Sequence, residues 1–255
     1  MSLKQRPIGV FDSGQGGLSV LRALYQIMPN ENYVFYGDSK NAPYGIKSPE
    51  EVYQLSKNIV DLLINKYNVK AIVIACNTAT SVAAQQLREE YDIPIIGLEP
   101  AIKPAIKSFP NGKITVMATP LTLSGAKFNH LVNSLHSDAQ IIKVPAPQLV
   151  KFVERDELDT IEIKDYLHRI LDEYLPVDAI VLGCTHFPFA QKAIQEIAGN
   201  VSFFDGSWGA ARHLKNQLEK NNELIHANDH KGVIEFLNSN PDPREIELSK
   251  KLFNM

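Results

Sequence analysis

The chain has 255 residues, of which 44% are aliphatic, aromatic or cysteine, and its net charge is −3. This length allows one large domain or two small ones. The charges are scattered without a basic stripe, which argues against nucleic acid as the main partner. There is no apolar stretch of membrane-spanning length, no secretory signal and no disulfide framework in the pattern, so we expect a soluble, cytoplasmic protein that does not bind membranes.

Strand and helix signals alternate along the chain and predict parallel sheets with helices on both faces. Short apolar runs predict strands at 7–11, 33–36, 71–75, 94–97, 114–118, 140–144, 179–183 and 201–204. Helices are predicted at 17–28, 49–67, 79–90, 100–108, 122–135, 147–154, 160–174, 188–198, 207–219 and 230–237. The start of the helix at 49–67 is well defined, because Ser48 can cap it and Pro49 suits its first turn.

The chain contains an internal repeat. The run Ala-Ile-Val-Ile-Ala-Cys-Asn-Thr at 71–78 reappears at 179–186 as Ala-Ile-Val-Leu-Gly-Cys-Thr-His, 108 residues later. Residues 8–13 match 114–119 at a similar offset, and 94–98 loosely match 201–205. Resemblance between unrelated βα units would not explain why Cys76 and Cys184, the only cysteines, fall in register. We therefore expect two pseudo-symmetric, doubly wound α/β domains that face each other across a cleft.

Two features of each cysteine predict a reactive thiol. Each follows a buried parallel strand, at the end of the sheet where ligands bind. Each also precedes a predicted helix start, where the pKa of a thiol is lowered. Lowering a thiol pKa from about 8.5 to about 7 raises the thiolate fraction at pH 7 more than tenfold. A lone buried cysteine is usually a small core residue, but an in-register pair favours acid–base chemistry on two sides of a ligand.

The first strand is followed by a glycine-rich loop, Asp12-Ser13-Gly14-Gln15-Gly16-Gly17. Asp38, farther along the chain, would suit a dinucleotide fingerprint. Against that interpretation, serine occupies the position where a packing glycine or alanine is expected, and Asp12 would repel a pyrophosphate. A small amphoteric ligand fits better, with its carboxylate on the loop amides and Asp12 near its amine or assisting proton transfer.

Two other chemistries remain open around Cys184. Cys184 and His186 have the spacing of metal ligands, but no further residues complete a zinc site with Cys76. They could also form the nucleophile and base of a thiol hydrolase, which would leave Cys76 without a role.

Further polar residues are expected at the same edge of the sheets, where the strands end. Tyr44 lies in a turn-like loop after the second strand, and Glu154 ends the predicted helix at 147–154. Ser13 and Thr119 are matched by the repeat and are natural donors to a carboxylate.

Four motifs in this order resemble glutamate racemase, a cofactor-independent family that supplies D-glutamate for bacterial peptidoglycan. They are Asp12-Ser13-Gly14-x-Gly16-Gly17, Pro43-Tyr44-Gly45, Cys76-Asn77-Thr78-Ala79 and Gly183-Cys184-Thr185-His186. The wider superfamily includes aspartate and hydantoin racemases, which remain the alternative. Ala118 departs from the glycine that is common before the threonine, which puts the geometry around Thr119 in question.

The resemblance implies a set of roles. Cys76 and Cys184 would be the acid–base thiols, assisted by Asp12, Glu154 and His186. Substrate would contact Asp12, Ser13, Tyr44, Gly45, Asn77, Thr78, Thr119, Thr185 and His186. The resemblance also implies glutamate as the small-molecule substrate, no cofactor or metal, and a homodimer. A two-lobed amino-acid-binding protein is a more remote alternative.

The internal repeat and the tail that follows it predict where the domains divide. We expect residues 1–98 with 207–255 to form the domain that carries Cys76, and 99–206 to form the domain that carries Cys184. The tail after Gly206 has no counterpart in the first half, and we expect it to pack back on the N-terminal domain.

Overall fold

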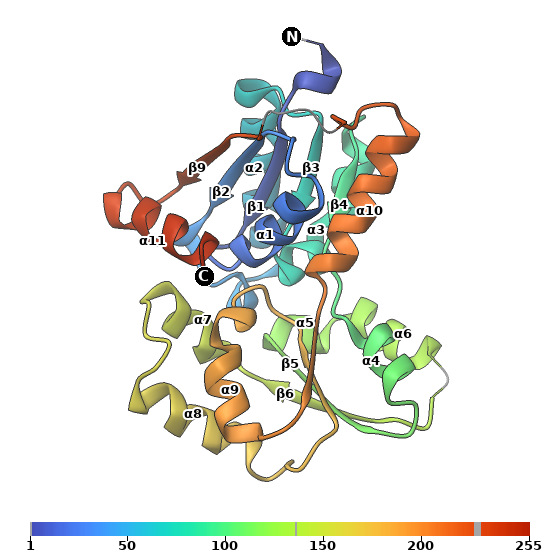
Figure 1. Cartoon of the computed structure of the whole chain (residues 1–255), viewed down its shortest axis with the longest axis vertical. Coiled ribbons are helices and arrows are strands. Elements are labelled where there is room, and N and C mark those ends of the chain that lie inside the picture. The colour runs from blue at the N-terminus through green and yellow to red at the C-terminus, as the bar shows by residue number, and fades with distance from the viewer. Residues whose placement is uncertain (1, 136, 227–230) are drawn as a thin grey trace.

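The computed structural model describes residues 2–135, 137–226 and 231–255, and it contains two α/β domains, each built on a wholly parallel sheet. The first sheet has the strand order β4-β3-β1-β2-β9 and the second has the order β6-β5-β7-β8. Figure 1 shows the first sheet above the second, with the chain crossing between them after β4 and again before α10. This arrangement confirms the predicted fold class.

The strands correspond closely to the apolar runs of the sequence. They are β1 (Ile8–Asp12), β2 (Tyr33–Gly37), β3 (Ala71–Ile74), β4 (Ile95–Gly97), β5 (Lys113–Ala118), β6 (Gln140–Pro145), β7 (Ala179–Leu182), β8 (Ser202–Asp205) and β9 (Ile234–Asn238). Every pairing in both sheets is parallel.

Helices cover both faces of each sheet. The α-helices are α1 (Leu18–Ile27), α2 (Pro49–Tyr67), α3 (Asn77–Glu90), α4 (Ile102–Ser108), α5 (Pro120–Ser124), α6 (Ala126–Ser134), α7 (Pro147–Glu154), α8 (Ile161–Leu171), α9 (Gln191–Ala198), α10 (Ser207–Lys220) and α11 (Pro243–Phe253). Short 3₁₀ turns lie at η1 (Leu3–Gln5), η2 (Ser39–Asn41), η3 (Tyr44–Ile46) and η4 (Phe187–Ala190). The start of α2 is as predicted, with the Ser48 side chain accepting from the backbone N–H of Glu51.

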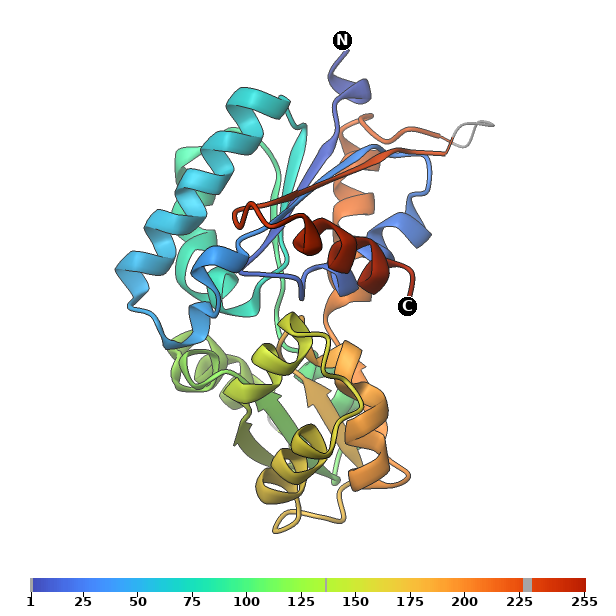
Figure 2. The ribbon, with the colours of Figure 1, turned by 90° about the vertical axis from the view of Figure 1, so that its left-hand side faces the viewer.

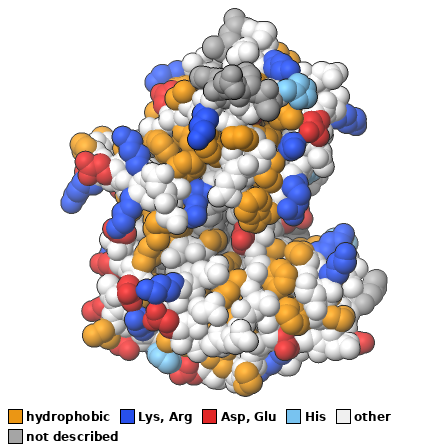
Figure 3. Space-filling view, viewed as in Figure 1, with side chains coloured by type: hydrophobic (Ala, Val, Ile, Leu, Met, Phe, Trp, Pro, Cys, Tyr) orange, Lys and Arg blue, Asp and Glu red, His pale blue; other side chains and the backbone are white. Residues whose placement is uncertain are grey.

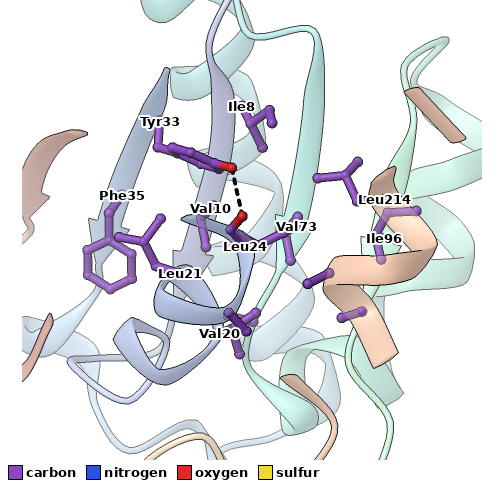
Figure 4. Close-up of a cluster of buried hydrophobic side chains, with 14 of the residues drawn as sticks. Ile8, Val10, Val20, Leu21, Leu24, Tyr33, Phe35, Val73, Ile96 and Leu214 are labelled. Atoms are coloured by element: carbon purple, nitrogen blue, oxygen red, sulfur yellow. Dashed lines mark hydrogen bonds between the residues drawn. The ribbon is translucent and has the colours of Figure 1, made fainter. Parts of the chain in front are cut away.

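The repeat in the sequence is a repeat in the sheets. Reading outward from the same side, β4-β3-β1-β2 of the first sheet correspond to β8-β7-β5-β6 of the second. Alternate residues of each strand enter the cores on the two sides of its sheet. Ile8 and Val10 of β1, for example, pack with Tyr33 and Leu24 between the sheet and α1 (Figure 4). The loops that follow the carboxyl ends of equivalent strands meet in the region between the two domains.

The C-terminal segment lies against the first sheet. Helix α10 packs on α1, β9 extends the sheet beyond β2, and α11 packs on α1 and β9 (Figure 2). The helix predicted at 230–237 is wrong: residues 234–238 form β9, and residue 230 lies outside the described residues. The strand forms because Ile234 and Phe236 face one core while Leu237 faces the other. The precise domain limits stay a prediction.

Two further helix predictions need correction. Residues 122–135 do not form one helix, because the chain breaks at Gly125 between α5 and α6. Helix α11 was not predicted, although Asp242 caps it and Pro243 occupies its first position. None of the described helices is both long enough and apolar enough to cross a membrane. Acidic and basic side chains are interspersed over the face drawn in Figure 3.

Candidate active site

The two thiols occupy equivalent positions in the two domains and face one pocket. Cys76 follows the end of β3 by two residues, and Cys184 follows the end of β7 by two residues. Both are free and buried, with 5% and 8% of their surfaces exposed. The register of the two sheets thus brings residues 108 positions apart in the sequence to the same site.

The pocket between the thiols is small and lined by both domains. Its lining consists of Ser13, Pro43, Tyr44, Gly45, Cys76, Asn77, Thr78, Thr119, Val150, Gly183, Cys184 and His186. A water-sized sphere can be centred within only about 10 Å³ of this pocket, which is room for roughly one water molecule. An amino acid is larger, so we expect the pocket to widen when one binds.

Cys76 is itself the N-cap of α3. Its Sγ accepts a hydrogen bond from the backbone N–H of Ala79 at 3.4 Å. The lowered thiol pKa expected for this position is wrong. Burial, reinforced by the nearby Asp12 carboxylate, raises the pKa of Cys76 to about 12 despite the helix N-terminus. Without substrate, Cys76 is therefore a neutral thiol at pH 7.

Cys184 has a different partner. Helix α9 begins only at Gln191, after the 3₁₀ turn η4, so Cys184 does not cap an α-helix. Its Sγ lies 3.7 Å from Nδ1 of His186, and Nε2 of the same ring lies 2.6 Å from Oε1 of Glu154. Burial alone would lower the pKa of His186, but the hydrogen bonds to Cys184 and Glu154 outweigh it and hold that pKa well above its usual range. The imidazole therefore lies between the sulfur and the carboxylate, in surroundings that favour its protonated form.

Asp12 lies behind the pocket and bridges the two domains. It is fully buried; its Oδ2 accepts from the backbone N–H of Gly14 at 3.0 Å, and its Oδ1 accepts from the Thr185 hydroxyl at 3.0 Å. Burial raises the pKa of Asp12, although His186 and these hydrogen bonds oppose the shift.

The glycines of the first loop permit close contact between the domains. A Cβ on Gly14 would lie 2.1 Å from Oε1 of Glu154, and one on Gly16 would lie 2.3 Å from Nδ1 of His186. A Cβ on Gly45 would lie 2.6 Å from the Cβ of Thr119. Side chains at these positions would hold the domains apart, which is a physical reason for the glycines in this motif.

Hydroxyl groups gather on the opposite side of the pocket. Thr78 Oγ1 lies 3.0 Å from Thr119 Oγ1 and 3.3 Å from Thr122 Oγ1, and the last two atoms are 3.0 Å apart. Among the described residues, no donor reaches Oδ1 of Asn77, which is buried beside them. These neutral groups are suited to bind a carboxylate.

Tyr44 is fixed by Asp38. The tyrosine hydroxyl donates to Oδ2 of Asp38 at 2.6 Å, and the Asn41 side chain donates to both oxygens of the same carboxylate. Burial, together with this carboxylate, raises the pKa of Tyr44 above its usual value, so it stays a neutral donor. Asp38, which suggested a dinucleotide fingerprint in the sequence, thus serves to orient Tyr44.

The structure brings the predicted site residues together, but not all of them line the pocket. Glu154 and Thr185 contact His186, which lines the pocket, and Asp12 accepts a hydrogen bond from Thr185. Val150 was missed, because an apolar residue of α7 has no signal that separates a pocket from a core. Thr122 was missed because its hydroxyl reaches the site only through the turn that begins α5. No group of three or more His, Cys, Asp or Glu side chains within the described ranges is placed to hold a metal ion.

This arrangement, a pocket between two similar α/β domains with one thiol from each, defines a class of racemase. The family model for Asp/Glu/Hydantoin racemase matches residues 8–214. A glutamate racemase of Clostridium perfringens is 51% identical over 257 aligned residues, covering 99% of this chain and 98% of the relative. The chain therefore belongs to the glutamate racemase family.

Solved structures agree with this assignment. Escherichia coli glutamate racemase, in complex with L-glutamate and the activator UDP-MurNAc-Ala, has a TM-score of 0.84 at 30% identity, covering 97% of this chain and 95% of that one. Glutamate racemase from Francisella tularensis, in complex with D-glutamate, has a TM-score of 0.83 at 27% identity, covering 99% and 95%.

Proposed function

We propose that this enzyme interconverts L- and D-glutamate by a two-base mechanism without a cofactor. The observation that carries the proposal is the pair of buried thiols, Cys76 and Cys184, which enter one pocket from equivalent strands of two domains. Inverting a carbon centre needs a base on one face and an acid on the other, and two facing thiols supply both. The glutamate-bound structures of similar racemases support the choice of substrate.

In the proposed reaction, each direction uses the thiols in opposite roles. With L-glutamate, the Cys184 thiolate removes the α-proton, and the Cys76 thiol donates its proton to the opposite face and becomes the thiolate. With D-glutamate, Cys76 is the base and Cys184 the acid. Burial keeps Cys76 neutral in the free enzyme, and the imidazole of His186 lies beside Cys184, which supports the first arrangement.

The carbanion must be stabilised by the surrounding groups. A turnover of about 10 per second corresponds to a barrier of about 16 kcal/mol, which a thiolate base alone would not reach. Preorganised donors around the substrate carboxylate, in a pocket closed to bulk water, supply the remaining stabilisation. The tight contacts of Gly14, Gly16 and Gly45 with the second domain support a closed catalytic state.

Glutamate is expected to be favoured over aspartate. The hydroxyls of Ser13, Thr78 and Thr119, which line the pocket, would bind the two carboxylates, and a shorter chain would leave buried donors unpaired. Each lost partner costs roughly 1–3 kcal/mol, or about 5- to 150-fold in kcat/KM. Polarimetry with L-glutamate, L-aspartate and L-glutamine tests this. Equal turnover of aspartate would place the enzyme among the aspartate racemases instead.

The decisive experiment is incubation of L-glutamate with the purified enzyme in D₂O. We expect the circular dichroism of the amino acid to decay to zero while its α-proton exchanges for deuterium. Binding without loss of optical activity would favour a two-lobed binding protein, and release of ammonia from L-glutamine without racemisation of glutamate would favour a thiol hydrolase. Either result would overturn the proposal.

The biological setting follows from the same chemistry. We propose that the enzyme is cytoplasmic and supplies D-glutamate for peptidoglycan. We also propose a homodimer, and a division of the chain into residues 1–98 with 207–255 and residues 99–206. Sedimentation analysis and limited proteolysis test the last two proposals.

A further inference from the structure

Gln15 lies between the glycines of the first loop, yet it is fully buried and its side chain does not line the pocket. Its amide is instead held by the C-terminal helix α11. Nε2 donates to the backbone oxygen of Glu245 at 3.0 Å and to Oε2 of Glu245 at 2.8 Å. The Ser249 hydroxyl donates to Oε1 of Gln15 at 2.7 Å. Both N–H groups and the carbonyl of this amide therefore have partners on one helix.

The backbone of the same loop faces the acid–base groups. The N–H of Gln15 donates to Oε1 of Glu154 at 2.6 Å, and the backbone nitrogen of Gly16 lies 3.2 Å from Nε2 of His186. Glu154 Oε1 in turn lies 2.6 Å from that imidazole nitrogen. The loop thus joins α11 on one side to the Glu154–His186 pair on the other, and Figures 1 and 2 show α11 lying directly above α7.

We propose that Gln15 is a positioning residue, through which α11 holds the loop amides against Glu154 and His186 and so orients the imidazole beside Cys184. This inference rests on the proposed racemase function for its kinetic consequences. Its structural part, the link from α11 to His186, can be tested without any turnover.

Cutting the link should slow the chemistry more than it weakens substrate binding. A misplacement of about 1 Å in a catalytic group costs up to about 100-fold in rate. Gln15→Met removes the polar amide but keeps a similar volume, and we expect it to lower kcat by about 10-fold with a smaller change in KM. Ser249→Ala removes one of the three anchoring hydrogen bonds and should have a smaller effect in the same direction.

A pair of variants tests the contact itself. Gln15→Glu places a carboxylate where Nε2 lies 2.8 Å from the Glu245 carboxylate, and it should be more damaging than Gln15→Met. Adding Glu245→Gln restores a donor opposite an acceptor, so the double variant should recover part of the lost kcat. Glu247→Gln is the matched control, because Glu247 is exposed on the same helix.

The second measurement is the side-chain ¹⁵N spectrum of the histidines, in which the His186 signals are identified by their loss in His186→Asn. We expect Gln15→Met and Ser249→Ala to shift these signals without substrate, while Glu247→Gln leaves them unchanged. The proposal is overturned if kcat and the His186 signals stay at wild-type values in both variants. It is also overturned if the variants lose only thermal stability, or if Gln15→Glu is not rescued by Glu245→Gln.

The proposed function and the positioning role of Gln15 can fail separately. If the wild-type protein does not racemise glutamate, the proposed function fails, while the His186 signals still decide the positioning role. If racemisation is normal but the signals are insensitive to Gln15 and Ser249, only the positioning role fails. Should Gln15→Met not fold, Ser249→Ala supplies the same comparison with a smaller change in volume.

Discussion

The two halves of the active site share a backbone plan but differ in how they support their thiols. Cys76 caps a 14-residue helix and lies near the buried carboxyl of Asp12. Cys184 precedes only a 3₁₀ turn and contacts the His186 imidazole, which is held by Glu154. The equivalent strands therefore determine where the two sulfurs lie, whereas the loops after the strands determine which groups surround each sulfur.

This asymmetry has a chemical use. Interconversion in either direction needs one protonated and one deprotonated thiol at the start. Asp12 lies near one sulfur and the His186 imidazole contacts the other, so the two thiols have unequal surroundings before substrate binds. With identical surroundings, neither thiol would be favoured as the base.

The largest expected effect comes from removing either thiol. Cys76→Ser and Cys184→Ser should each lower the rate of racemisation by roughly 10²–10⁴-fold or more, because each thiol can reach only one face of the substrate α-carbon. Elimination of HCl from a suitable β-chloroglutamate isomer needs one base and should survive in each variant. Circular dichroism follows the racemisation, and full activity in Cys76→Ser would refute the two-base comparison.

Replacing the helper residues tests the pairing of helpers with thiols. We expect Asp12→Asn and His186→Asn to lower kcat by about 10- to 100-fold, with different ratios for the two enantiomers, since each helper serves one thiol. The equilibrium constant of one fixes the ratio of kcat/KM values, so the difference appears in kcat. Equal proportional losses in both directions for both variants would remove the assignment.

The glycines at the domain contact should affect activity more than folding. Gly16→Ala would press a methyl group on the His186 ring, and Gly45→Ala would press one on Thr119. We expect each to lower kcat/KM by about 10-fold, because the domains can no longer close fully. The matched control is Gly209→Ala in α10, where no atom lies within 4 Å. It should leave kcat/KM unchanged and stabilise the fold by about 0.5–1 kcal/mol.

The smallest effect is a change in stability with pH. The pKa of Asp12 is raised in the folded protein, so the native state binds more protons than the unfolded state between 3.8 and the raised value, and Asp12 lowers stability as pH rises through that interval. Asp12→Asn should therefore unfold at higher urea concentration than the wild type at pH 8. The difference should shrink as pH falls toward 3.8. A variant less stable at pH 8 would mean that lost hydrogen bonds to Gly14 and Thr185 dominate.

Most of the fold could be predicted because its signals are local. Apolar runs that end in polar residues marked the first eight strands, and the repeat marked their correspondence. The ninth strand was not predicted, because the apolar residues Ile234, Phe236 and Leu237 have spacings that suit a short helix as well as a strand. Only pairing with β2 decides between them.

By itself, the sequence determined which residues carry the chemistry: two in-register cysteines, the glycine-rich loop and the hydroxyl residues at strand ends. The tertiary structure decided the state and the partners of those groups. The raised pKa of Cys76 depends on burial and on a carboxylate 64 positions away in the sequence, and the partners of His186 and Gln15 come from distant helices. Hydrogen bonding and desolvation act through space, so they become defined only when the two domains and the C-terminal helix are packed together.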